Sequence, residues 1–277
     1  MADATVEQLQ RPSVGELLRA WRGKRRLSQL EVALVAGVST RHLSFVETGR
    51  SRPSAELLVA LADVLDLPLR ERNELLLAAG FAPRYSQTRL DAPDMGAMQQ
   101  AITRVLDAHD PYPGVALDRQ WNVVVANAAA RRLLSVLPPD LVAETPHNLF
   151  RLSLHPRGMA AFTANFDEWG RYLLRELQRL AEGGLDEPAA ALLAEVSAYP
   201  NVRALLARPA ATLPAANPLI VSCVLDIGGE RLAFFTTLAT FGSPRDVTLA
   251  ELTVELFYPV DAATAAALRA VAARSAS

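Results

Sequence analysis

The chain has 277 residues, 51% of them hydrophobic, so it can bury one large core or two ordinary ones and is not globally disordered. Its formal net charge of −2 excludes a uniformly basic nucleic-acid-binding protein. The only cysteine is Cys223, which excludes an intrachain disulfide and fits a reducing cytoplasm. No signal peptide is evident, and no apolar run approaches the roughly 20 residues that span a bilayer. We therefore expect a cytoplasmic protein that does not enter membranes.

Charge is distributed unevenly along the chain. Residues 1–90 carry 13 Lys and Arg against 10 Asp and Glu, a net of +3, and the remainder carries 15 against 20, a net of −5. This division favours a first domain that binds phosphate and a second that does not. Residues 1–12 are polar and are expected to form a disordered N-terminal arm.

Residues 13–82 show the apolar spacing of five short helices, each with a recognisable start or stop. The second begins at a capping box of Ser28 and Glu31, and Leu30, Val32, Ala33 and Ala36 form its predicted apolar face. The predicted helices are Val14–Gly23, Ser28–Ala36, Thr40–Thr48, Ser54–Leu65 and Pro68–Ala79.

The second and third predicted helices are separated by a short turn. Gly37 suits the left-handed conformation that ends a helix, Val38 fills the turn from inside, and Ser39 can cap the next helix. Helix, short turn and helix together predict a helix-turn-helix. The alternative is a plain helical hairpin whose polar face contacts only water.

The exposed face of the third helix is the expected DNA-reading surface, because such a helix presents its N-terminal residues to base edges in the major groove. Arg41 suits guanine, hydroxyl groups suit several bases, and Phe45 suits a thymine methyl. The expected DNA-binding residues are Gln29, Ser39, Thr40, Arg41, Ser44, Phe45, Arg50 and Arg52. Of these, Gln29, Arg50 and Arg52 are expected to contact phosphates. The basic run Arg22–Arg26 fits either a solvated loop or a further phosphate contact.

The pattern S-Q-x-x-x-A-x-x-A-G-V-S…L-S-x-x-E-x-G-R-x-x-P resembles the Cro/C1-type, or XRE-type, helix-turn-helix family of bacterial regulators. The resemblance covers roughly Val14–Ala79 and implies an all-α, five-helix DNA-binding bundle. It also implies a structural salt bridge between Arg22 of the opening helix and Glu47 of the recognition helix. Phe45 departs from the polar residue that the family often has at this position.

Residues 83–94 contain Pro83 and Pro93 and no clear period, which predicts a linker. Residues 95–277 then mix helical and strand patterns, and Gly228-Gly229 marks a hairpin. We expect an α+β domain of about five antiparallel strands with helices to one side. The predicted strands are Gly114–Leu117, Trp121–Ala126, Leu219–Ile227, Arg231–Phe241 and Thr248–Phe257, the last with Leu252, Val254 and Leu256 on one face. The predicted helices are Met95–His109, Asn127–Leu137, Arg157–Gly183, Glu187–Tyr199, a short one after Asn201, and one from Asp261 to Arg274.

Four short motifs in this region resemble the PAS-like ligand-binding domain of MmyB-like regulators: W-N-V-V-V-A-N from Trp121, N-L-F-R from Asn148, H-P-R-G from His155, and T-F-G-S-P-R-D-V-T-L-A-E-L from Thr240. The resemblance implies a cavity between sheet and helices that binds a small effector, with an apolar or lipid-like molecule as the expected class. Candidate lining residues are Trp121, Phe162, Phe166, Trp169, Phe234 and Phe235, with His155 and Asn165 as polar contacts. The alternative is that these aromatic residues are ordinary core.

Catalytic signatures are missing from the sequence. It has no P-loop, no G-x-S-x-G elbow, no dinucleotide-binding glycine motif and no histidine spacing typical of a zinc site. We therefore expect no catalytic residues, no metal and no cofactor.

These observations predict a cytoplasmic bacterial transcription regulator that binds double-stranded DNA. Because one recognition helix reads only a few base pairs, a homodimer on a palindromic operator is expected. Two alternatives stay open: a regulator whose second domain only dimerises, and an enzyme with a fused DNA-binding head.

Overall fold

The computed structural model describes residues 12–143, 145–183, 187–209 and 220–275. The arm expected at residues 1–12 lies, except for Pro12, outside the described residues. The chain divides into two compact units. Unit 1 contains the residues up to Thr88 together with Ser243–Ala250, and unit 2 contains Arg89–Gly242 and Glu251–Ser277. The second domain was expected to comprise residues 95–277, but Ser243–Ala250 belongs to unit 1.

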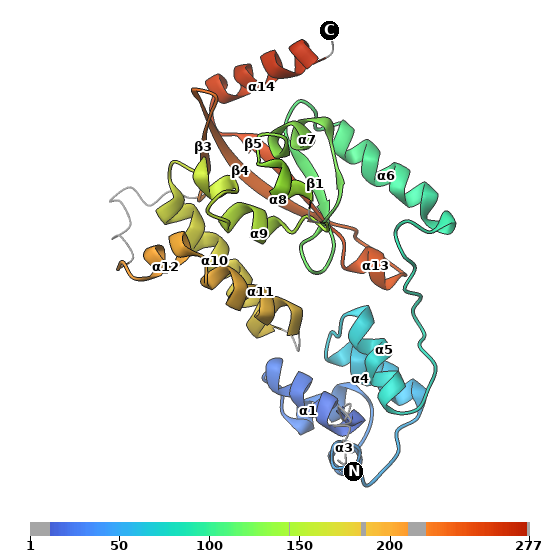
Figure 1. The fold of residues 1–277 in the computed structure, drawn as a ribbon. Coiled ribbons are helices and arrows are strands. Elements are labelled where there is room, and N and C mark those ends of the chain that lie inside the picture. Colours follow the sequence, from blue (N-terminus) through green and yellow to red (C-terminus); the bar gives the residue numbers. More distant parts are fainter. Residues whose placement is uncertain (1–11, 144, 184–186, 210–219, 276–277) are drawn as a thin grey trace, which may run out of the picture. The chain divides into compact units, whose positions relative to one another are not determined.

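Unit 1 begins with the five expected helices, whose bounds match the sequence pattern to within about two residues (Figure 1). Ser13, Ser28, Ser39 and Ser54 stand before four of them, and each hydroxyl accepts a hydrogen bond from a backbone N–H of the first turn. These caps fix where each helix starts. The helices are α1 Val14–Lys24, α2 Gln29–Val35, α3 Thr40–Glu47, α4 Ala55–Val64 and α5 Leu69–Ala78.

The turn between α2 and α3 follows the expected pattern. Gly37 has φ +69°, a conformation that glycine adopts without strain. The predicted apolar face of α2 is wrong at Leu30, which is 65% exposed, whereas Val32 and Ala33 are buried. At 3.6 residues per turn, Leu30 lies roughly a third of a turn away from that pair.

The segment Ser243–Ala250 is held in unit 1 by a backbone hydrogen bond and by the side-chain carboxylate of Asp246. Val247 is fully buried, and its N–H donates to the carbonyl of Ser86 at 2.8 Å. Asp246 accepts from the N–H of Thr88 at 3.0 Å and from that of Thr248 at 2.8 Å, and helix α13 (Val247–Ala250) follows. The predicted strand Thr248–Phe257 is therefore wrong in its first half, because the Asp246 carboxylate starts a helical turn there.

Unit 2 is organised around a five-stranded antiparallel sheet in the order β2-β1-β5-β4-β3 (Figure 1). This confirms the expected α+β class. Gly228 and Gly229 have φ of +60° and +82°, as a tight two-residue hairpin turn requires. The strands are β1 Gly114–Leu117, β2 Val123–Ala126, β3 Cys223–Ile227, β4 Glu230–Thr240 and β5 Thr253–Pro259.

The helices of unit 2 differ from the expected ones between residues 138 and 165, where α8, α9 and η2 form. The long helix predicted from Arg157 begins only at Phe166, because Phe162 and Ala164 bond to β3 instead: the Asp226 N–H donates to the Phe162 carbonyl at 2.8 Å. The helices are η1 Pro93–Met95, α6 Gly96–Asp107, α7 Ala128–Leu134, α8 Pro139–Ala143, α9 Leu149–Leu154, η2 Met159–Ala161, α10 Phe166–Gly183, α11 Glu187–Ser197, α12 Pro200–Leu206 and α14 Ala262–Ser275.

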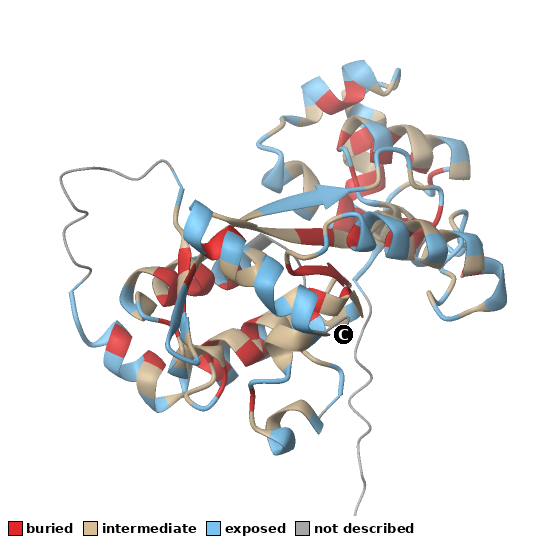
Figure 2. Cartoon of the chain, turned by 90° about the horizontal axis from the view of Figure 1, so that it is seen from above, coloured by how far each residue is buried: buried red, intermediate tan, exposed pale blue. Residues whose placement is uncertain are grey.

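Both faces of the sheet are covered, which corrects the expectation of helices to one side. On one face Val254 of β5 packs with Ile102 and Leu106 of α6. On the other, residues of β3 and β4 pack with α9, α10, α11 and α12. Buried residues accordingly lie along the strands and on the inner sides of the helices in Figure 2. Successive residues of β5 therefore point into two different interiors.

Candidate functional site

The outer side of α3 carries the side chains expected to read DNA. Arg41 is exposed, and Thr40, Ser44 and Phe45 are half-buried. The Arg41 guanidinium lies 5.3 Å from the centroid of the Phe45 ring, within cation–π range. Phe45 can thus orient Arg41. This pairing offers a reason for an aromatic residue where a polar one is common.

The other expected DNA contacts flank α3. The Ser39 hydroxyl accepts from the His42 N–H at 3.1 Å, so it caps the helix. The Gln29 side-chain nitrogen donates to Glu47 Oε2 at 2.7 Å, which holds the amide against α3. Arg50 and Arg52 follow the helix and are exposed, as phosphate-binding side chains must be.

Arg22 and Glu47 form the ion pair that the family resemblance implies, with Nε to Oε1 at 2.7 Å. Burial raises the pKa of Glu47, but hydrogen bonds from Arg22 and Gln29 outweigh it, so the pKa lies below its usual value. The basic run Arg22–Arg26 also contributes Arg25, whose guanidinium donates to the Leu65 carbonyl at 2.8 Å. Two members of the run are therefore held by bonds within unit 1.

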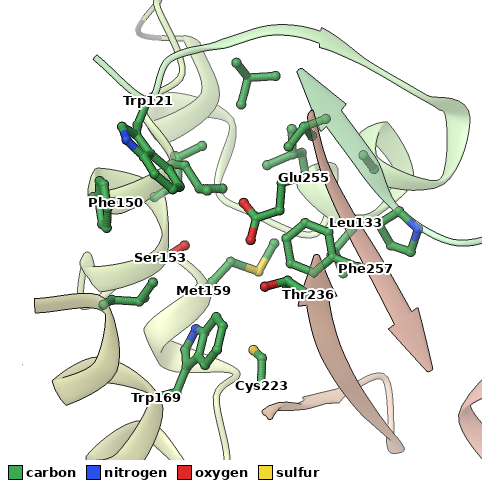
Figure 3. Close-up of a pocket in the computed structure, with 18 of the residues that line it drawn as sticks. Trp121, Leu133, Phe150, Ser153, Met159, Trp169, Cys223, Thr236, Glu255 and Phe257 are labelled. Carbon is green, nitrogen blue, oxygen red and sulfur yellow. The ribbon is translucent and has the colours of Figure 1, made fainter. Parts of the chain in front are cut away.

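Unit 2 contains a cavity of about 90 Å³ between the sheet and helices α7, α9 and α10 (Figure 3). Its walls are mostly aromatic or aliphatic, with Trp121, Leu133, Phe150, Met159, Trp169 and Phe257 among them. Trp121 and Trp169 were expected to line such a cavity. The other expected residues do not line it.

The remaining expected pocket residues have structural positions elsewhere in unit 2. Phe234 is 1% exposed and belongs to the core. Phe166 packs against the same core, and Phe235 stacks on Tyr258 with ring centroids 5.2 Å apart. Phe162 is half-buried in the segment that bonds to β3. These four aromatic residues therefore fit the alternative interpretation, in which they pack within the domain and do not line a ligand cavity.

The two expected polar contacts also lie away from the cavity. Asn165 donates from Nδ2 to the Ser222 carbonyl at 2.8 Å and accepts from the Val224 N–H at 3.0 Å, so its amide fastens α10 to β3. His155 lies in a separate polar hollow, edge-on to Tyr199 with ring centroids 5.1 Å apart.

Sequence reasoning missed the polar groups that do line the cavity: Ser153, Tyr172, Glu176, Cys223, Thr236 and Glu255. Burial raises the pKa of Glu255 to about 7, partly opposed by a hydrogen bond from Thr236. Burial and the nearby Glu255 raise the pKa of Cys223 to about 12. A signal was present, because an acid interrupts the apolar run V-E-L-F of β5. If helices covered only one face of the sheet, as expected from the sequence, this acid would point to solvent.

Within the described ranges, no three His, Cys, Asp or Glu side chains gather as they would around a metal ion. Over the same residues, every helix is too short or too polar to cross a bilayer.

A helix-turn-helix bundle followed by an α+β domain with an apolar cavity defines a DNA-binding regulator with a ligand-binding domain. Comparison with known families agrees. Residues 98–271 match the MmyB-like transcription regulator ligand binding domain, and residues 18–72 match the helix-turn-helix family. The chain belongs to the family of MmyB-like transcription regulators. Regulators of this kind are generally not enzymes.

Among characterised proteins, the chain is similar to the transcriptional regulator ClgR of two Mycobacterium tuberculosis strains, CDC 1551 / Oshkosh and ATCC 25618 / H37Rv. Each is 33% identical over 118 residues, which is 43% of this chain and 90% of the relative. A solved RNA-binding light-oxygen-voltage receptor aligns with 95% of this chain at 12% identity and a TM-score of 0.29. The chain spans 64% of that receptor chain. So low a TM-score does not establish a shared fold.

Proposed function

We propose that the protein is a cytoplasmic, homodimeric transcription regulator that inserts α3 into the major groove of a palindromic operator. The observation that carries this proposal is the outer face of α3. The exposed Arg41 guanidinium lies over the Phe45 ring there, and two further exposed arginines, Arg50 and Arg52, follow the helix. An arginine held in this way can donate two hydrogen bonds to guanine, and the flanking arginines can neutralise phosphates. Two copies about one DNA turn apart then read enough bases for useful specificity.

We further propose that a small, apolar or lipid-like effector binds in the cavity of unit 2 and modulates operator binding. The apolar walls and few polar groups of the cavity support this. They favour a sensing domain over the alternative in which the second domain only dimerises. A domain that serves only as an interface has no need of an internal cavity.

The connectivity of the chain supplies a route for the coupling. The segment Ser243–Ala250 belongs to unit 1, yet it joins β4 to β5, and these strands carry the cavity residues Thr236 and Glu255. A ligand that binds better to one spacing of these strands would shift the segment and the DNA-binding unit with it. A ligand with equal affinity for both arrangements would shift nothing.

The test starts from the full chain and a pool of randomised duplex DNA, from which bound sequences are selected. We expect a palindromic consensus and a complex of two chains on one duplex, measured by mass photometry. Arg41→Ala should weaken operator binding by roughly 1–3 kcal/mol and relax the base preference at one position of the consensus. Arg84→Ala, which removes an exposed positive charge from a segment expected to be a linker, is the matched control. Selection of no consensus, or equal effects of the two variants, would refute the proposal.

A further inference from the structure

Glu255 occupies an unusual place for a carboxylate. It lies in β5, the central strand of the sheet, between Val115 of β1 and Leu238 of β4. The residue is 6% exposed, and its Oε2 atom has no hydrogen-bond partner among the described residues. A buried carboxylate that is not paired destabilises a fold by more than an apolar side chain of the same size would. A residue of this kind therefore indicates a partner that binds from outside the chain.

The Glu255 carboxyl points into the cavity of about 90 Å³ (Figure 3). The surrounding walls are formed by Trp121, Trp169, Phe257 and other apolar side chains. Because a single water needs only about 10–15 Å³, this space admits a small organic molecule or several waters. Thr236 donates a hydrogen bond to this carboxyl, but the cavity lining offers it no cation.

The charged residues that line the cavity are both acids. No Lys, Arg or His occurs among the described residues that line it, whereas a second acid, Glu176 of α10, does. Glu176 accepts a hydrogen bond from Arg179, which lies one turn further along α10 and whose side chain is largely exposed. The other titratable groups of the lining are Tyr172 of α10 and Cys223 of β3, and burial is the main cause that raises the pKa of each. The charges of Glu176 and Glu255 raise the pKa of Tyr172 further, against Arg175 and Arg179, and the charge of Glu255 does the same for Cys223. Within the cavity, Glu255 therefore has no cation of its own.

We propose that this cavity binds a small apolar amine, whose ammonium group pairs with Glu255 and whose hydrocarbon body lies against Trp121, Trp169 and Phe257. The inference rests on the proposed function and gives the chemical class of its effector. An ammonium supplies the positive charge and the hydrogen-bond donors that Oε2 lacks. The aromatic walls also favour a cation over a neutral molecule of the same shape.

Other ligand chemistries fit the same site less well. A carboxylate would face two acids with no cation in the lining, so like charges would repel it. An alcohol could donate one hydrogen bond to Oε2 but would leave the carboxylate charge uncompensated. A pure hydrocarbon would fill the space and leave Oε2 as it is.

Proton linkage gives the amine a distinct signature. Burial raises the pKa of Glu255 to about 7, so the carboxyl is partly protonated at neutral pH. An ammonium selects the ionised form, so its binding releases protons from Glu255 near neutral pH. A carboxylate ligand would select the protonated form and take protons up.

The experiment uses the 277-residue chain and two matched sets of probes. One set is phenethylamine, 2-phenylethanol and phenylacetate, and the other is hexylamine, hexanol and hexanoate. Titration calorimetry at pH 7, in two buffers of different ionisation enthalpy, gives affinity and proton exchange together. We expect the amine of at least one set to bind tenfold or more tightly than its alcohol and acid, with proton release. Glu255→Gln should weaken amine binding tenfold or more and abolish the release. Glu182→Gln, which removes an exposed acid of α10 outside the lining, should change neither.

Each result decides the matter. Tighter binding of an alcohol or an acid overturns the amine inference but leaves a ligand-binding regulator in place. Equal amine affinity in the Glu255→Gln variant, once circular dichroism shows that it is folded, also overturns it, as does failure of both amines to bind. An amine that binds through Glu255 without changing operator affinity supports the site and refutes effector control, so the two proposals fail separately.

Discussion

The guanidinium of Arg22 in α1 donates to both carboxylate oxygens of Glu47 in α3, at 2.7 and 2.9 Å. The Gln29 side chain of α2 donates to the same carboxylate at 2.7 Å, and the Glu47 side chain is 1% exposed. Three helices of unit 1 are thus joined at one buried acid. The position of α3 relative to α1 and α2 therefore depends on this acid.

Removing the acid should loosen unit 1. We expect Glu47→Ala to lower the free energy of unfolding of unit 1 by about 3 kcal/mol, because the substitution leaves a partly buried guanidinium without its acceptor. The measurement is native-state hydrogen exchange of the α1 and α3 amides in the full chain, which reports this unit separately from unit 2. As control, the double variant Arg22→Met, Glu47→Leu should lose much less stability than Glu47→Ala, because it leaves no unpaired charge. Similar losses in both would show that packing, not the unpaired charge, dominates.

A glycine next to this pair fixes how closely α1 approaches α3. A Cβ atom at Gly15 would lie 2.4 Å from the backbone oxygen of Glu47. Backbone cannot move aside as a side-chain tip can, so Gly15→Ala should destabilise unit 1 by roughly 1–3 kcal/mol despite the better helix propensity of alanine. The matched control lies in the same helix: a Cβ at Gly23 meets nothing within 4 Å. Gly23→Ala should leave stability equal or higher, and a loss at Gly23 as large as at Gly15 would contradict the steric reason.

Local signals made the helices of unit 1 predictable from sequence. The capping box of Ser28 and Glu31 requires only four consecutive residues, and the structure forms both of its hydrogen bonds. The pairing of Arg22 with Glu47 came instead from a family pattern, since 25 residues separate the two. Sequence spacing alone does not show that they meet.

The cavity illustrates what sequence does not reveal. Trp121 and Trp169 were correctly predicted to line the cavity, because large aromatic residues near a sheet commonly form cavity walls. Glu255 was missed because its burial depends on which faces of the sheet the helices cover, and alternation along β5 fits either answer. The placement of Ser243–Ala250 in unit 1 depends on contacts with residues some 160 positions earlier, such as Asp246 with Thr88. Such long-range pairing leaves no periodic trace.

The thiol of Cys223 should be unreactive in the folded protein. It is 7% exposed, and burial together with Glu255 raises its pKa to about 12. Because the thiolate is the reactive form, labelling by a disulfide reagent at pH 8 should be on the order of a hundredfold slower in the native chain than in urea. Colorimetric thiol titration measures both rates, and the urea sample is the control for reagent activity. Equal rates would show that the cavity opens freely to solvent.

Unit 2 should lose stability as the pH rises through neutrality, because of Glu255. Burial raises the pKa of this carboxyl from 4.5 to about 7 in the folded state, so the folded form holds its proton more tightly than the unfolded form does. The resulting stabilisation is complete below about pH 4.5 and is lost as the pH rises to about 7. The full change is roughly 3 kcal/mol, at 1.36 kcal/mol per pKa unit.

Carboxylates with lowered pKa values, such as Asp261, act in the opposite direction, so the expected result is a difference between two proteins. The free energy of unfolding of the wild type minus that of Glu255→Gln should fall by roughly 2.5 kcal/mol between pH 5 and pH 8. Urea unfolding, followed through tryptophan fluorescence, provides both curves; Trp121 and Trp169 in the cavity wall are two of the three tryptophans, and Trp21 of unit 1 is common to both proteins. A bound amine should flatten the difference, because an ammonium beside Glu255 stabilises the ionised carboxylate and lowers its folded-state pKa. Parallel pH profiles of the two proteins without ligand would mean that the Glu255 carboxyl is already solvated or paired.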